Sequence, residues 1–234
     1  MKLFLIPNLI AENTYHYLPP IIKEIIEKTT YYLVENEKSA RRFISSLGTN
    51  HNIRDLQFFR LDKRTKANDL VTIFEKIPSN RNVGVISEAG CPGIADPGAI
   101  AVAMAHTKNI PVIALPGPSS IFLALMSSGF SGQQFAFHGY IPNKNPEKNI
   151  FLKRITERLQ KNNETQIFME TPYRNEQLLK DLLQYLSPET QLCIAANLTA
   201  PDQIVKTFPV KLWKRQKPKL HKLPTIFLIG NIGR

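Results

Sequence analysis

The stretch NVGVISEAGCPGIADPGAIAVAMAH (residues 82–106) decides how this chain of 234 residues is read. Its opening run NVGVIS is mostly apolar, as in a strand buried on both faces, and its closing run GAIAVAMAH has the small side chains of a closely packed helix. The segment that joins them, SEAGCPGIADPG, holds three glycines, two prolines and two carboxylates. We predict a strand, a glycine-rich loop and a helix, with Asp96 as N-cap and Pro97 at the first helical position.

On both sides of this stretch, short apolar runs alternate with segments of helical period, which is typical of β–α units. The predicted strands lie at residues 2–6, 30–36, 56–61, 82–87 and 109–117, and the predicted helices at residues 19–28, 39–48, 66–78 and 98–106. The helix at 39–48 is expected to open on Ser39 and to stop at Gly48. Together these elements predict a domain with a mainly parallel sheet.

The segment LPGPSS (residues 115–120) is the predicted boundary between two domains, because it combines turn formers with an N-cap serine. Beyond it, the run at 133–142 alternates as an antiparallel or edge strand would. The other strands predicted there lie at residues 165–172, 190–197, 203–208 and 225–230, and the helices at residues 121–129, 145–162 and 174–187. The sequence therefore predicts an α/β protein with a mainly parallel domain at 1–115 and a mixed α/β domain at 116–234.

The composition limits the class of protein. There are 30 Lys and Arg against 19 Asp and Glu, a formal net charge of +11, which favours a polyanionic partner such as nucleic acid but also fits an enzyme from a lysine-rich proteome. Cys91 and Cys193 lack the spacing of a disulfide framework or a zinc site, which favours a reducing cytoplasm. Pro7 and Asn8 interrupt the first apolar run, so we expect a strand and not a signal peptide, and no run approaches the roughly 20 residues of a membrane span.

The loop at 87–98 follows the carboxyl end of a predicted parallel strand, where open α/β sheets bind ligands. Gly90 and Gly93 allow a positive φ and let the main chain approach a flat or extended ligand. Neither GxGxxG nor GxxxxGK[ST] is present, so neither a classical dinucleotide fold nor a P-loop is indicated. Ser119 and Ser120, at the start of the next helix, offer hydroxyl and N–H groups to an adenosine or a carboxylate. The alternatives are a tight turn that binds nothing and plain helix capping.

Five segments, taken together, resemble a known family: SEAGCPGIADPG, LPGPSS, SSGF, FAFHGYIPNK and METPYR. In this order and at about this spacing, they are similar to the motifs of the ribosomal small-subunit RNA methyltransferase I family, a branch of the tetrapyrrole methylase superfamily. The chain departs from the family pattern at Glu88, Cys91 and Tyr173, where the family has Asp, Thr and His. In addition, IPNLIAEN stands where the family has a first loop richer in glycine.

The resemblance implies two α/β domains with S-adenosyl-L-methionine (SAM) in the cleft between them, and a homodimer. A methyl sulfonium needs no metal ion for transfer, so none is expected. The SAM-binding residues that it implies are Pro7, Ser87, Glu88, Ala89, Gly90, Cys91, Ile94, Ser119, Ser120, Met169, Leu198, Pro224 and Thr225. Of these, Leu198, Pro224 and Thr225 would contact adenine, largely through main-chain groups.

Methyl transfer from a sulfonium depends mainly on alignment, but a ribose 2′-hydroxyl as acceptor benefits from a general base. Glu88 is the predicted catalytic residue, because it follows the strand at 82–87 directly. Glu35 and Glu170 are the other candidates. Alternatively, Glu88 orders its own loop or forms a hydrogen bond with a hydroxyl of the cofactor, and this alternative stays open.

Three further features carry two interpretations each. Arg174 pairs with Glu170 or holds a substrate phosphate. The basic run KLWKRQKPKLHK (residues 211–222) contacts RNA with Trp213 stacked on a base, or it is a solvated loop or helix with Trp213 in the core. His138 is expected to be a satisfied structural histidine and not a catalytic one.

Three functions fit these features. The leading hypothesis is a cytoplasmic SAM-dependent methyltransferase that modifies a ribose 2′-oxygen of small-subunit rRNA. The alternatives are a methylase of a small molecule such as a tetrapyrrole, and a catalytically inactive protein that binds SAM and RNA.

Overall fold

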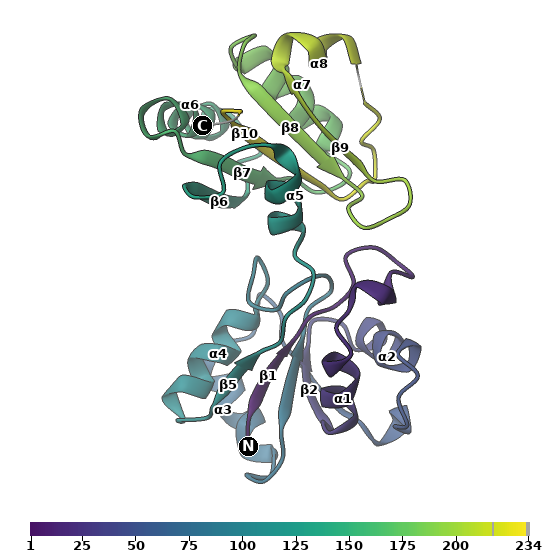
Figure 1. Cartoon of the computed structure of the whole chain (residues 1–234). Coiled ribbons are helices and arrows are strands. Elements are labelled where there is room, and N and C mark those ends of the chain that lie inside the picture. Colours follow the sequence, from purple (N-terminus) through teal and green to yellow (C-terminus); the bar gives the residue numbers. More distant parts are fainter. Residues whose placement is uncertain (217, 233–234) are drawn as a thin grey trace. The chain divides into compact units, whose positions relative to one another are not determined.

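The computed structural model describes residues 1–216 and 218–232, and the contacts within the chain group into two units (Figure 1). The first unit is Met1–Ser119 and the second is Ser120–Arg234. The domain bounds 1–115 and 116–234 stay a prediction. None of the described helices is long and apolar enough to cross a membrane.

The first unit is built on a parallel sheet of five strands in the order β3-β2-β4-β1-β5. Its strands are β1 (Leu3–Ile6), β2 (Tyr31–Val34), β3 (Gln57–Arg60), β4 (Val83–Ile86) and β5 (Val112–Ala114). Its helices are η1 (Tyr15–Tyr17), α1 (Ile21–Glu27), α2 (Glu37–Ser46), η2 (Ile53–Asp55), α3 (Ala67–Lys76) and α4 (Gly98–Thr107). The predicted alternation of strands and helices is confirmed here.

Side chains at alternate positions of these strands pack on opposite faces of the sheet. Phe4 and Ile6 of β1 join a buried cluster with α1 and α2, whereas Leu3 of the same strand joins another with α3 and α4. Helices therefore cover both faces of the sheet, and a ligand is expected to bind at the ends of the strands. Because β1 and β4 are parallel neighbours, the loops that follow them lie side by side at the carboxyl ends of the strands.

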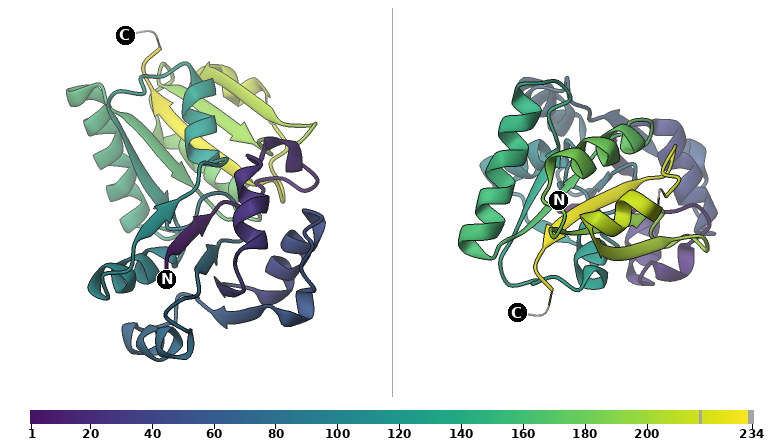
Figure 2. Two further views of the ribbon diagram at one scale, coloured as in Figure 1. Left: turned by 60° about the horizontal axis from the view of Figure 1, so that its bottom comes forward. Right: turned by 90° about the horizontal axis from the view of Figure 1, so that it is seen from above.

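The second unit contains a mixed sheet of five strands in the order β6-β7-β10-β8-β9 (Figure 2). Its strands are β6 (Phe135–Tyr140), β7 (Thr165–Met169), β8 (Gln191–Ala196), β9 (Ile204–Pro209) and β10 (Thr225–Gly230). Its helices are α5 (Ser120–Ser128), α6 (Glu147–Asn162), α7 (Asn175–Tyr185) and α8 (Val210–Gln216). Apolar side chains of α6, α7 and α8 form one buried cluster with the sheet, and α5 contacts β8, β9 and β10.

The structure corrects two local predictions. Helix α2 begins at Glu37 and not at Ser39, because the side chain of Asn36 accepts hydrogen bonds from the main-chain N–H groups of Lys38 and Ser39. Strand β6 lies at the sheet edge, as one reading of its alternation predicted, but it runs parallel to β7. Alternation shows which side chains are buried and is silent about the direction of the neighbouring strand.

Candidate functional site

The loop that follows β4 is ordered from within. Ser87 is buried, and its hydroxyl donates to the main-chain carbonyls of Ala89 (3.2 Å) and Gly90 (3.0 Å). Gly90 has a φ of +69°, a conformation that strains any residue with a side chain. Ser87 therefore shapes the start of the loop, in which Glu88 and Ala89 are exposed, as Ile94 and Ala95 are further along.

The same loop ends in helix α4, one residue later than predicted. Gly98 is the first helical residue, and Pro97 is the residue before it. Asp96 nevertheless acts as the predicted cap, because its Oδ1 accepts the N–H of Gly98 at 2.7 Å. The same oxygen accepts the N–H of Gly93 at 2.7 Å, so one carboxylate both closes the loop and caps the helix.

Asn8, directly after Pro7 at the end of β1, binds this loop to the neighbouring strand. Its side-chain amide donates to the carbonyls of Ser87 (2.9 Å) and Glu88 (3.2 Å). Its main chain exchanges two hydrogen bonds with Gly90, at 2.9 and 3.2 Å. Asn8 was not among the predicted site residues. The available signal was an asparagine placed directly behind the first strand of a β–α protein, where parallel strands bring their loops together.

The segment LPGPSS packs against both of these loops. A Cβ at Gly117 would lie 2.2 Å from the Cβ of Pro7, so only glycine allows this close approach. The thiol of Cys91 donates to the carbonyl of Pro118 with Sγ and O 3.4 Å apart. Pro7 and Cys91 are thus brought together with LPGPSS, whose Ser119 is the last residue of the first unit.

Two acidic side chains of the loop, Glu88 and Asp96, lie close enough to Glu35 to affect its ionisation. Burial raises the pKa of Glu35, and the negative charges of Asp96 and Glu88 raise it further. Burial also raises the pKa of Asp96, although two main-chain N–H groups oppose this effect. Burial and then the charge of Asp96 raise the pKa of the Cys91 thiol, which makes it a hydrogen-bond donor and not a nucleophile at neutral pH. Within the described part of the chain, no three His, Cys, Asp or Glu side chains are placed to hold a metal ion.

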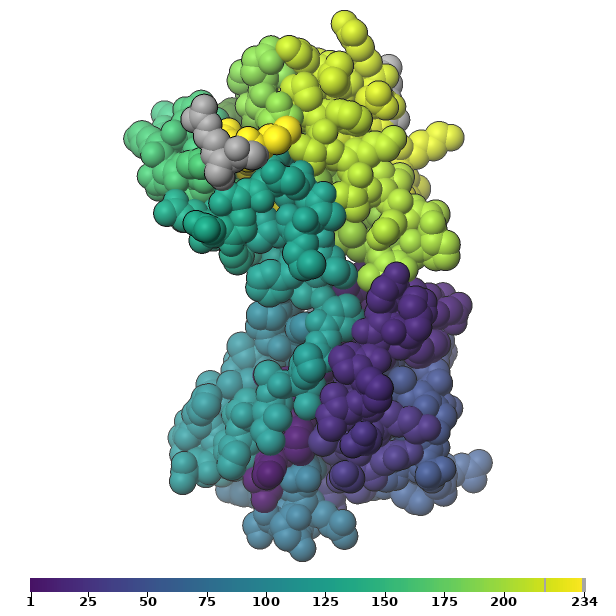
Figure 3. Space-filling view, in the orientation of Figure 1, coloured from purple at the N-terminus to yellow at the C-terminus, as the bar shows by residue number. Residues whose placement is uncertain are grey.

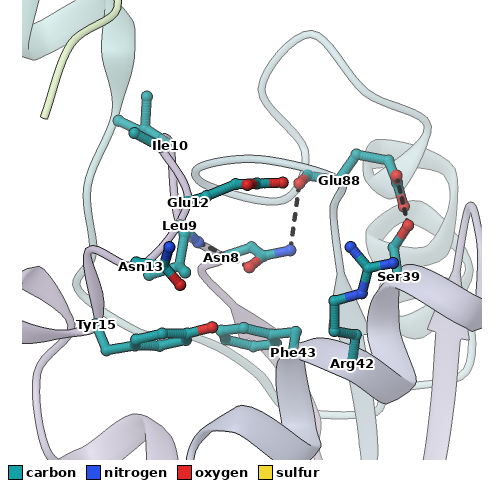
Figure 4. Close-up of a pocket in the computed structure, with 11 residues that line it drawn as sticks. Asn8, Leu9, Ile10, Glu12, Asn13, Tyr15, Ser39, Arg42, Phe43 and Glu88 are labelled. Carbon is teal, nitrogen blue, oxygen red and sulfur yellow. Dashed lines mark hydrogen bonds between the residues drawn. The ribbon is translucent and has the colours of Figure 1, made fainter. Parts of the chain in front are cut away.

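A pocket of about 370 Å³ lies beside the loop (Figure 4). Its lining comes from the segment after β1, from α2 and from Glu88, and consists of Asn8, Leu9, Ile10, Ala11, Glu12, Asn13, Tyr15, Ser39, Arg42, Phe43 and Glu88. In Figure 4, Arg42, Ser39 and Glu88 lie on one side, and the segment after β1 lies on the other. The rings of Tyr15 and Phe43 lie along the bottom of that view.

Glu88 is accessible in this pocket and is held in place. Its Oε2 accepts the hydroxyl hydrogen of Ser39 at 3.0 Å, and both residues line the pocket. Arg42 lies on the same helix as Ser39, and its side chain forms no ion pair or hydrogen bond among the described residues. Ser39 and Arg42 were not predicted as site residues, because their link to Glu88 joins segments far apart in the sequence.

In the second unit, the predicted site residues gather at one end of the sheet. Met169 ends β7 and is paired with Ile226, while Thr225 begins β10. The carbonyl of Pro224 accepts the N–H of Asn197, which places Leu198 at the same end; the bond is 2.8 Å long. The hydroxyl of Thr225 donates to a neighbouring carbonyl, and Leu198 is buried, so main-chain groups are the polar atoms left there for a ligand. Ser120 is the first residue of α5, apart from this group in the sequence.

Glu170 and Arg174 form an ion pair, which confirms the structural interpretation of Arg174. Glu170 is buried, and its Oε1 lies 2.5 Å from Nη2 of Arg174 and accepts the N–H of Thr171 at 2.6 Å. A carboxylate engaged in this way is a weaker candidate for a general base than the accessible Glu88.

The remaining two ambiguous residues have structural roles. Trp213 is buried in the core of the second unit, and its Nε1 donates to the carbonyl of Leu192 at 2.8 Å, which confirms the core interpretation; the alternative, stacking on RNA, is wrong. His138 is bonded through Nε2 to Oε1 of Gln166 at 2.7 Å, and its ring meets that of Phe151 edge-on. Burial lowers the pKa of His138, so the ring is neutral at pH 7. Lys217, within the basic run 211–222, lies outside the described residues.

A match to the Tetrapyrrole (Corrin/Porphyrin) Methylases spans residues 13–212. The chain belongs to this family. Solved structures agree with a tetrapyrrole methylase fold: the methyltransferase CobJ has a TM-score of 0.61 at 16% identity, over 92% of this chain and 89% of that one. Uroporphyrin-III C-methyl transferase from Thermus thermophilus, complexed with S-adenyl homocysteine, has a TM-score of 0.57 at 13% identity, over 99% and 98% of the two chains.

Curated relatives carry the name ribosomal RNA small subunit methyltransferase I. The relative from Synechocystis sp. (strain ATCC 27184 / PCC 6803 / Kazusa) is 35% identical over 127 residues, which are 54% of this chain and 44% of the relative. The relative from Haemophilus influenzae (strain ATCC 51907 / DSM 11121 / KW20 / Rd) is 31% identical over 175 residues, or 74% and 60% of the two chains. The predicted resemblance is confirmed, and the chain spans about half the length of these relatives.

Proposed function

We propose that this tetrapyrrole methylase is a SAM-dependent methyltransferase that acts on small-subunit rRNA and methylates a ribose 2′-oxygen. The observation that carries the proposal is the glycine loop after β4, ordered by Ser87, Asn8 and Asp96 at the carboxyl edge of a parallel sheet. Support for the substrate comes from curated relatives that are named rRNA methyltransferases.

The residues of the first unit fit SAM as a ligand. A Cβ at Gly90 would lie 3.4 Å from the carbonyl oxygen of Pro118, already in van der Waals contact, so a longer side chain there would have to enter the space beside the two predicted cofactor segments. Ser87 orders the loop after β4, and Pro7 and Cys91 contact the segment LPGPSS. The residues that we propose to hold SAM in this unit are Pro7, Ser87, Glu88, Ala89, Gly90, Cys91, Ile94 and Ser119. Those proposed in the second unit are Ser120, Met169, Leu198, Pro224 and Thr225.

Bound SAM supplies a sulfonium methyl group: the acceptor oxygen bonds to the methyl carbon while the carbon–sulfur bond breaks, which leaves S-adenosylhomocysteine and releases the proton of the acceptor. The part of the chain in this chemistry is to orient the acceptor and to accept that proton. Glu88 is the base that we propose, because it is accessible, lies on the cofactor loop and is oriented by Ser39.

Two surface features support RNA as the partner. The first is the net charge of +11, which favours a polyanion. The second is the exposed ring of Tyr173, which lies beside the basic segment that contains Lys222. Tyr173 is 71% exposed and its ring lies 6.1 Å from that of His221. The N–H of Lys222 donates to the carbonyl of Pro172, which holds the basic segment beside this tyrosine. Tyr173 therefore replaces Trp213 as the proposed stacking residue for single-stranded RNA.

We further propose a homodimer in which α5 contacts a second copy of the chain, and a cytoplasmic location, where small ribosomal subunits are found. Phe122 and Met126 lie one turn apart on α5 and are 52% and 80% exposed. The space-filling view shows the teal segment of α5 at the surface (Figure 3). Exposed apolar side chains grouped on one helix are typical of protein–protein contacts.

Calorimetric titration with SAM and S-adenosylhomocysteine tests the proposed function. We expect one molecule bound per subunit, and radiolabelled methyl transfer to small subunits that lack native methylation. Gly90→Leu should weaken SAM binding on the order of tenfold or more, because the side chain would fill the space between two cofactor segments.

Gly48→Leu is the matched control, because Gly48 also has a positive φ, +60°, but a Cβ there meets nothing within 4 Å. Both substitutions strain the backbone in the same way, and only Gly90→Leu should change SAM affinity. Equal SAM affinity in the two variants, both folded, would contradict the cofactor-loop assignment.

A further inference from the structure

The pocket between the segment after β1 and helix α2 has no part yet in the proposed function. It shares Glu88 and Asn8 with the cofactor loop, yet most of its lining lies outside that loop. We propose that this pocket, defined above by its lining residues, receives the RNA nucleotide whose ribose is methylated. The inference rests on the proposed function, since it names where the substrate of that reaction binds.

The charges of the pocket favour a nucleotide over a tetrapyrrole. Its lining holds one cation, Arg42, and two carboxylates, Glu12 and Glu88. A macrocycle with many carboxylates would meet more negative than positive charge there, at a repulsive cost. A nucleotide instead brings a single phosphate charge for the cation, and hydroxyl and amino hydrogens for the carboxylates.

The size of the pocket leads to the same choice. Its volume of about 370 Å³ is near the lower end of the range of small-ligand sites. One nucleotide that is turned out of its strand fits such a volume, and enzymes that modify nucleic acids commonly extrude the target residue in this way. A tetrapyrrole macrocycle is several times larger than one nucleobase and would need a wider trough.

Each chemical part of a nucleotide has a partner in the lining. Arg42 is free of any ion pair among the described residues, which leaves its guanidinium available for phosphate. Tyr15, which is partly exposed, supplies aromatic surface for the base, and Phe43 beside it in the lining is buried in the core. Glu88, oriented by the hydroxyl of Ser39, is an acceptor for a ribose hydroxyl.

The position of Glu88 connects this pocket to the reaction. Glu88 lines the pocket and belongs to the loop proposed to hold SAM, and Asn8 bonds to that loop while lining the pocket as well. A ribose hydroxyl bonded to Glu88 would thus lie next to the methyl donor, as transfer between them requires.

The test measures RNA binding directly, without SAM. A short fluorescein-labelled single-stranded oligoribonucleotide and its deoxy counterpart are titrated with the protein over a series of salt concentrations, and anisotropy gives each Kd. Arg42→Ala should weaken binding of both strands by about tenfold and lower the slope of log K against log salt by about 0.7, the loss of one phosphate contact. Glu88→Ala should reduce the preference for the ribo strand and leave the salt slope unchanged, because it removes a hydroxyl contact.

Arg81→Ala is the matched control, because Arg81 is an exposed arginine in the turn before β4, at the opposite edge of the same sheet. It should change neither affinity nor slope. The pocket assignment is overturned if the wild-type protein does not bind the oligoribonucleotide, if Arg42→Ala and Glu88→Ala bind both strands as the wild type does, or if Arg42→Ala weakens SAM binding in calorimetry. RNA binding that depends on Arg42 and Glu88, in a protein that transfers no methyl group to small subunits, would refute the proposed function and leave the pocket assignment standing.

Discussion

In the loop after β4, the side chain of Asp96 has more than one structural and electrostatic role. Asp96 caps α4 and closes the loop with one oxygen, while its other oxygen is buried without a hydrogen-bond partner. The charge of Asp96 also acts on Glu35, whose pKa is raised by burial and then by Asp96 and Glu88. A raised carboxylate pKa means that ionisation disfavours the folded state, so the charge of Glu35 costs stability at neutral pH.

Glu35→Gln should therefore stabilise the protein at neutral pH. The penalty of the Glu35 charge is absent below the ordinary glutamate pKa of 4.5 and grows as the pH rises through the raised value in the folded state. The gain from the substitution should thus appear at neutral pH and vanish below pH 4.5. Urea unfolding at both pH values measures it, with the exposed Glu75→Gln on α3 as control. A gain that is equal at both pH values would contradict this electrostatic account.

Helix α8 buries its tryptophan although the surrounding sequence is basic. Its cations lie on a short amphipathic helix that buries Val210 and Trp213, three positions apart, so the tryptophan points into the core between basic neighbours. The loop after β7 has the opposite character, because Tyr173 is left exposed beside His221. The RNA-binding ring is therefore expected outside the basic run.

Substitutions of these two aromatic residues should separate stability from RNA binding. Trp213→Ala should lower the free energy of unfolding by about 3–5 kcal/mol, because it leaves a large cavity in the core and removes the hydrogen bond from Nε1 to the carbonyl of Leu192. Tyr173→Ala should leave stability nearly unchanged and raise the Kd for single-stranded RNA by about fivefold or more.

Tyr185→Ala, a substitution of a partly exposed tyrosine on α7, serves as the control for Tyr173. Denaturant unfolding and anisotropy titrations measure the two effects. Normal RNA affinity in a folded Tyr173→Ala protein would rule out the stacking role.

At the scale of the whole molecule, the chain is two units with different sheets. The parallel sheet of the first is covered on both faces, whereas the second carries α5 with Phe122 and Met126 exposed. An apolar helix face of this kind is the surface that we expect a second copy to cover.

Met126→Asp should convert the proposed dimer to a monomer, because a charge at the contact would be buried without a partner. Sedimentation velocity measures the change. Ile150→Asp, at a comparably exposed apolar residue on α6, is the control and should leave the dimer intact. A wild-type protein that sediments as a monomer would refute the dimer.

The features that the sequence determined by itself are local. The strand, loop and helix between 82 and 106 follow from an apolar run, glycines and a capping carboxylate, all within a few residues of the groups that they affect. The same holds for the alternation of strands and helices and for the motifs that identify the family, because both are patterns along the chain. The start of α2 is the exception, since Asn36 and Ser39 are both good caps and only the folded backbone chooses between them.

The tertiary structure alone decided which distant residues meet. Asn8 and Ser87 are 79 positions apart and become partners because β1 and β4 are neighbours in the sheet, an order that the sequence pattern leaves open. The contact of Ser39 with Glu88 and the pocket around Arg42 arise in the same way. A periodic pattern states which face of an element is buried, but strand order, strand direction and the partners of polar side chains depend on packing between elements. The candidate site is made of such partners, and therefore only part of it could be predicted.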